Sequence, residues 1–310
     1  MSAVRVPWSG PSFLVYLGGV TVFGATIGLL GVEEAARGAG GFVLAAALVL
    51  VVVCLLAWAA ARTGHGITAG LLSVTCVAAV VVLLGALFDW FGWLANFDHP
   101  FRGFRVSILV LELATVIAAA VALRMFQFPL LAFVIAGGVW FFLTDLLSGG
   151  GNGSAAVTLV VGIALLISAL GLDAHGARTY AFWPHVVAGL TLGGGWLWFF
   201  HDGDLDWILV GLAAVLYITL GDALLRSSWI VLGGWGLLQA TAHFAAKWAD
   251  LTAFFYLFPF AALNFDGYPR HYDDPWLAPL VFAALGLAFI GLGLLFARRR
   301  RESVAGPALL

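Results

Sequence analysis

Ten long apolar runs divide this chain, and nearly all of its charged residues fall in the short gaps between them. A helix needs about 20 mostly apolar residues to cross the hydrocarbon core of a bilayer. The runs of that length cover residues 12–31, 41–61, 67–91, 106–123, 128–147, 155–172, 182–200, 207–225, 228–248 and 276–297. We therefore expect an all-α fold, a polytopic integral membrane bundle of about ten transmembrane helices, with residues 1–310 forming one transmembrane domain.

The composition excludes an ordinary soluble fold. Hydrophobic residues make up 63% of the chain and charged residues 10%, with a mean hydropathy of +1.07. Soluble domains carry roughly 25% charged residues, so the lipid bilayer must be the main partner of this surface. The net charge is -2 and the basic residues are scattered, which argues against binding to nucleic acid.

Arginine positions predict the orientation, because cytoplasmic loops of membrane proteins are enriched in basic residues. Arg298 to Arg301 directly follow the last run, which places the C-terminus in the cytoplasm. Alternation through the other runs places the N-terminus there too, with five further arginines on the same side: Arg5, Arg62, Arg124, Arg178 and Arg226. Thirteen arginines against a single lysine, together with many alanines and 39 glycines, are typical of GC-rich bacteria, so we expect a multi-pass protein of a bacterial inner membrane.

An eleventh apolar run, residues 251–263, is too short to span and contains Pro259. It fits an interfacial or re-entrant segment on the outer side. The longer outer segment 249–275 has two interpretations, a lid over the mouth of the bundle or a plain interfacial helix with its connector.

Glu112 is the strongest candidate for a functional group. It lies within the run 106–123, about 10 Å below the expected outer interface. A carboxylate there costs about 2.5–3.5 kcal/mol on insertion scales and is expected to face a partner inside the bundle. His243 lies at a similar predicted depth, with Lys247 one turn further out. The three residues could form a proton or cation site, and the alternative is a buried polar pair that locks two helices together.

Four carboxylates follow aromatic residues at the outer ends of the predicted helices. They are Asp89, Asp145, Asp202 and Asp250. Such a set could form an acidic rim that attracts cations. The alternative is the usual sequence of aromatic belt and polar loop at a membrane surface.

Residues 161–173 align without gaps on residues 210–222. The preceding helices also end alike, in Trp140 to Asp145 and Trp198 to Asp202. This predicts parallel helical hairpins rather than the inverted repeat of many transporters. Glycine pairs such as Gly189 and Gly193 allow close helix packing, within this chain or in a homo- or hetero-oligomer.

No known catalytic motif and no metal-ligand spacing occurs in the sequence, so we expect neither an enzyme nor a bound cofactor or metal. Two functions remain open. One is a small-solute or cation transporter whose candidate coupling ion is the proton. The other is a non-transporting membrane scaffold or accessory subunit that binds a partner protein.

Overall fold

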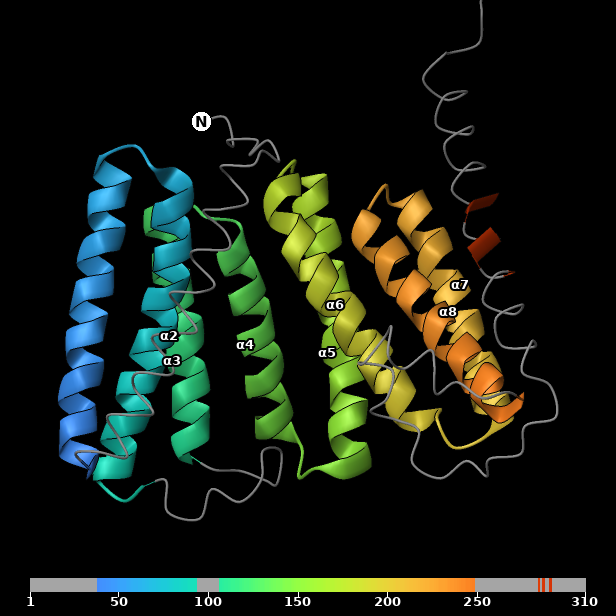
Figure 1. Cartoon of the computed structure of the whole chain (residues 1–310), viewed down its shortest axis with the longest axis horizontal. Helices are drawn as coiled ribbons and strands as arrows, with labels where there is room; N and C mark the ends of the chain where they lie inside the picture. The colour runs from blue at the N-terminus through green and yellow to red at the C-terminus, as the bar shows by residue number, and fades with distance from the viewer. Residues whose placement is uncertain (1–37, 94–105, 249–283, 285, 288–289, 292–310) are drawn as a thin grey trace, which may run out of the picture. The chain divides into compact units, whose positions relative to one another are not determined.

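The computed structural model describes residues 38–93 and 106–248, together with 284, 286, 287, 290 and 291. Side chains are described up to Phe244 in the second range. These ranges fold into helices, with no strand among them. The helices are Gly38–Arg62, α2 (Gly66–Trp90), α3 (Val106–Phe126), α4 (Leu130–Leu147), α5 (Gly151–Ala174), α6 (Arg178–Phe199), α7 (Asp204–Ala223) and α8 (Ser227–Trp248) (Figure 1).

The helices coincide with the second to ninth predicted spans to within a few residues. Six of them are long and apolar enough to cross a membrane: Gly38–Arg62, α2, α3, α4, α5 and α7. The predicted span 12–31 and the predicted interfacial or re-entrant segment 251–263 lie outside the described residues. Of the span 276–297 only five residues are described, all of them helical. The total of ten spans and the side of the two termini therefore stay predictions.

The distribution of side chains is that of a protein surrounded by lipid. Large apolar residues lie on the outside, for example Leu44 at 74% exposure and Val231 at 69%. Small residues such as Ala119 and Ala188 fill the interior at 0% exposure. Water would penalise such a surface, whereas hydrocarbon accepts it. The chain is a multi-pass membrane protein.

The chain divides into two compact units, residues 1–195 and 196–310. In the first unit, Val77 of α2, Ala119 of α3 and Leu131 of α4 belong to one buried apolar cluster. In the second, Trp207 and Val210 of α7 pack with Ala240 of α8. Each unit is thus held by contacts between consecutive antiparallel helices (Figure 1).

Tight turns close the hairpins α3–α4, α5–α6 and α7–α8, at Gln127, Gly176 and Leu225. All three residues have positive φ, which is the left-handed conformation that commonly ends a helix. Each residue lies 49 positions after the previous one. We call the end with this turn the turn end of a hairpin and the opposite end its open end.

The step of 49 residues also relates helix boundaries. Helix α5 ends at Ala174 and α7 at Ala223, while α6 spans Arg178–Phe199 and α8 spans Ser227–Trp248. The backbone bonds of the two turns match as well, since Ala177 N–H donates to Leu172 and Arg226 N–H donates to Gly221. The step that relates residues 161–173 to residues 210–222 therefore extends over the hairpins α5–α6 and α7–α8. The similar helix ends Trp140 to Asp145 and Trp198 to Asp202 do not follow this step.

Close contacts between the two helices of a hairpin also recur at multiples of 49 residues. A Cβ placed on Gly138 of α4 would lie 2.9 Å from Val116 Cγ2 of α3. A Cβ on Gly236 of α8, 98 positions later, would lie 3.0 Å from Ala214 Cβ of α7, also 98 positions later. The three hairpins are thus copies of one packing unit, and residues at equivalent positions can be compared directly.

Arginines gather at the turn ends. Within 38–93 and 106–248 the arginines are Arg62, Arg124, Arg178 and Arg226. The last three lie within three positions of a hairpin turn, and Arg62 lies two positions before Gly64, which has φ +82°. This distribution agrees with the predicted placement of the turn ends at the cytoplasmic surface.

Candidate functional site

Glu112 of α3 lies beside Asp145 of α4 in the α3–α4 hairpin, close enough for the two carboxyl groups to interact. Glu112 lies about 9 Å from the first residue of α3, and Asp145 lies two residues before the end of α4. Glu112 precedes the Gln127 turn by 15 residues and Asp145 follows it by 18. An antiparallel hairpin brings two such positions to nearly the same depth, close to its open end.

The pair needs a proton. A carboxylate only accepts hydrogen bonds, so two carboxyl groups can bond to each other only when one of them is protonated. Two like charges at this separation in a low-dielectric setting would also repel strongly. Asp145 is 6% exposed, and lipid surrounds the hairpin. The geometry therefore fits a pair of acids that holds one proton between them.

Further oxygens at this site have no donor. Glu112 Oε2, Asp145 Oδ1 and Thr144 Oγ1 are buried without a hydrogen-bond partner in the described ranges. Thr144 is 1% exposed. Buried polar atoms are nearly always satisfied in folded proteins, so the oxygens of Glu112 and Asp145 have unused capacity to accept a hydrogen bond here.

Polar contacts also join α4 and the residues after it to α5. Trp140 Nε1 of α4 donates to Thr158 Oγ1 of α5 over 3.0 Å. Beyond the end of α4, the hydroxyl groups of Ser148 and Ser154 lie 2.7 Å apart. The bond to Thr158 gives the indole N–H of Trp140 a hydrogen-bond partner.

The acid pair is not a requirement of hairpin packing. The position of Glu112 corresponds to Val161 in α5 and to Val210 in α7. The position of Asp145 corresponds to Gly194 in α6 and to His243 in α8. Two hairpins with the same turn fold without the pair, so the cost of burying it at α3–α4 needs a reason other than folding.

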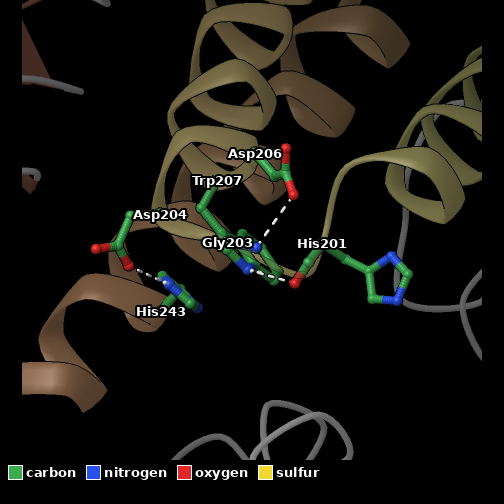
Figure 2. A network of polar contacts seen from close by, with 6 residues as sticks. All are labelled: His201, Gly203, Asp204, Asp206, Trp207 and His243. Carbon is green, nitrogen blue, oxygen red and sulfur yellow. Dashed lines mark hydrogen bonds and ion pairs between the residues drawn. The ribbon is translucent and has the colours of Figure 1, made fainter.

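His243 has its own carboxylate partner in the second unit. His243 is 5% exposed, and its Nε2 lies 3.3 Å from Asp204 Oδ1 at the start of α7. Its ring stacks on Trp207, with the ring centroids 4.8 Å apart. Figure 2 shows the imidazole facing Asp204 beside this indole, while the ring of His201 points away.

Backbone groups fix this second site. Trp207 Nε1 donates to the carbonyl oxygen of His201 over 3.0 Å. The backbone N–H of Gly203 donates to Asp206 Oδ2 over 3.1 Å, which closes the first turn of α7 (Figure 2). The network thus connects the start of α7 to the last turns of α8. It is compatible with a structural role of the His243–Asp204 bond as well as with a role in proton transfer.

The predicted pairing of Glu112 with His243 joins residues of different units, so it stays a prediction. The side chain of Lys247 lies outside the described residues. Sequence reasoning placed His243 at the depth of Glu112, and the repeat explains why, because His243 occupies in α8 the position of Asp145 in α4. The same depth argument could have selected Asp145.

The four carboxylates of the predicted acidic rim have different surroundings. Asp89 is exposed at the end of α2, and the Asp202 side chain is 88% exposed beside His201. Asp145 is buried against Glu112, so it belongs to the interior of a hairpin. Asp250 lies outside the described residues, and the rim as a whole stays a prediction.

Metal ligands do not cluster in the ranges 38–93 and 106–248, where no group of three His, Cys, Asp or Glu residues could hold a metal ion. The acid pair with its unsatisfied oxygens suits a proton or a weakly held monovalent cation better than a tightly coordinated metal. No protein-family model, curated protein or solved structure matches this chain, so its function is argued from the site itself.

Proposed function

We propose that this protein is a proton-coupled membrane transporter of a small solute or cation, in which the Glu112–Asp145 pair carries the coupling proton. The single observation that supports the proposal is a pair of adjacent carboxyl groups, a half-buried Glu112 and a buried Asp145, between two helices that are long and apolar enough to span a membrane. Intramembrane acids are rare and costly, and they commonly mark proton relays and ion pathways.

The mechanism follows from the chemistry of the pair. With one proton the site carries a single negative charge, and loss of that proton leaves two adjacent carboxylates. The doubly charged state favours a cation or a new proton, so occupancy by one excludes the other. Such exclusion at one site is a means of coupling two fluxes.

Proton movement in proteoliposomes tests the proposal. Vesicles loaded with a pH-sensitive dye are given inward gradients of Na⁺, of K⁺ and then of a panel of amino acids, sugars and organic cations. We expect wild-type protein to move protons with at least one gradient and Glu112→Gln to abolish that movement. Asp222→Asn, which changes a carboxylate at the turn end of the α7–α8 hairpin, is the matched control and retains the wild-type rate.

Two outcomes contradict the proposal. One is proton movement by wild-type protein no faster than in empty vesicles under every gradient, which favours the scaffold alternative. The other is equal rates for Glu112→Gln and wild type, which removes the pair from the mechanism.

A further inference from the structure

A second acid–base pair lies at the opposite end of the first unit. His185 of α6 is fully buried at 0% exposure, and its Nε2 lies 2.9 Å from Asp173 Oδ2 at the end of α5. The Asp173 side chain is 20% exposed. Protein rather than lipid therefore surrounds the imidazole of His185, while the carboxylate of Asp173 is partly exposed.

The two pairs lie at opposite ends of neighbouring helices in the same unit. His185 lies about 10 Å along α6 from Arg178, the first residue of the helix, and is therefore near the turn end. Tyr180 Oη donates to the carbonyl oxygen of Gln127 over 3.0 Å, so the turn ends of α5–α6 and α3–α4 lie together. Asp145 lies about 22 Å along α4 from Leu130, at the open end.

The hairpin repeat shows that the second pair is also not needed for folding. In the α7–α8 hairpin, Asp222 occupies the position of Asp173, and Gly234 occupies the position of His185. In the α3–α4 hairpin, the corresponding residues are Arg124 and Ala136. Only the middle copy of these three hairpins combines a buried histidine with a carboxylate at the turn end.

We infer that His185 and Asp173 form a second proton-transfer site, called the second station below, which passes protons between the interior of the first unit and water at the turn end. The inference rests on the proposed function. His185 takes up one proton from the interior and passes one proton to Asp173 across the 2.9 Å contact. Asp173 releases that proton to water, and the ring returns to its starting charge, so one proton enters and one leaves.

The charged surroundings suit proton exchange with water. The titratable and charged groups at this end, in α5, α6 and the α3–α4 turn beside them, are Asp173, His175, Arg178, Tyr180 and Arg124. His175 and the two arginines are exposed, and His175 bonds to its own helix through the Gly171 carbonyl. Asp173 is thus the group that links the buried imidazole to this polar surface.

The proteoliposome assay with three variants tests the second station. We expect His185→Gln and Asp173→Asn to slow proton movement by about tenfold or more, while Asp173→Glu restores part of the rate. Asp222→Asn is the matched control, because it changes the equivalent residue of a hairpin with glycine in the place of histidine. It should stay within about twofold of wild type, a change of about 0.4 kcal/mol.

Nitrogen-15 NMR of histidine-labelled protein adds a direct readout of the His185–Asp173 contact. Subtraction of the His185→Gln spectrum assigns the His185 signals among the seven histidines. We expect a hydrogen-bonded Nε2 that shifts in Asp173→Asn, with no shift in Asp222→Asn.

Each outcome has one meaning. Wild-type rates in both His185→Gln and Asp173→Asn, with Glu112→Gln inactive, overturn the second station and leave the proposed function standing. Absence of proton movement in wild-type protein overturns the proposed function and the second station together. An inactive but misfolded His185→Gln leaves the decision to Asp173→Asn, which alters a partly exposed helix end.

Discussion

Single polar residues hold the second unit together at the start of α7. Asp204 bonds to the buried His243, whereas Asp202, two residues earlier, is 88% exposed. We expect Asp204→Asn to lower the free energy of unfolding by about 0.5–1.5 kcal/mol, because the imidazole loses a charged acceptor. The measurement is thermal unfolding in detergent micelles.

Asp202→Asn is the control for that comparison and should leave the midpoint of unfolding unchanged. Equal losses in the two variants would show that general surface charge, rather than the bond to His243, stabilises this end of α7. A wild-type midpoint for Asp204→Asn would show that the bond contributes nothing.

At the scale of helices, two adjacent glycines of α8 distinguish the effect of helix–helix packing on stability from the effect of helix propensity. A Cβ on Gly233 would lie 2.5 Å from the carbonyl oxygen of Ala214 in α7, whereas a Cβ on Gly234 has no atom within 4 Å. We expect Gly233→Ala to destabilise the protein by about 1–3 kcal/mol, since the helices must separate. Gly234→Ala should stabilise it by about 0.5–1 kcal/mol through lower backbone entropy.

Chemical unfolding of both variants in mixed micelles measures the difference. The same sign of change for the two glycines would contradict the close approach of α7 and α8 at Gly233, since only one of the two positions contacts the neighbouring helix.

The hairpin turns give a second comparison between elements. Leu225 has φ +54° and is 57% exposed, while Gly176 has φ +77° at the equivalent position. We expect Leu225→Gly to stabilise the α7–α8 hairpin by about 1 kcal/mol, because glycine adopts this conformation without steric cost. Gly176→Ala should destabilise α5–α6 by a similar amount, as seen in the midpoint of unfolding.

The two turn variants thus change stability in opposite directions if the turns are equivalent. Destabilisation by Leu225→Gly would mean that the leucine side chain contributes more packing than its conformation costs.

At the scale of the whole molecule, hydropathy predicted the described helices well. A run of apolar residues long enough to span must form a helix in lipid, because every backbone polar group needs a partner there. The runs 155–172 and 228–248 accordingly coincide with α5 and α8. Their boundaries differ by a few residues, since caps and turns rather than hydropathy end a helix.

The sites were predicted less completely. The sequence singled out Glu112 as an acid within a predicted span, but its partner depends on helix neighbours and rotation, which hydropathy does not determine. Asp145 and Glu112 lie almost equally far from the Gln127 turn, so the hairpin alone could have suggested their contact. His185 and Asp173 lie at unequal distances from Gly176, and no simple spacing rule predicts that pair.

The proton held by Glu112 and Asp145 is the central claim, and infrared spectroscopy of the protein in membranes tests it most directly. At neutral pH we expect a protonated carboxyl band in wild type that shifts in D₂O. The band should change its frequency in both Glu112→Gln and Asp145→Asn, because each change removes one of the two groups that share the proton, and it should stay at the wild-type frequency in Asp89→Asn. A wild-type spectrum without a protonated carboxyl band, or a band unchanged in both variants, would contradict the account.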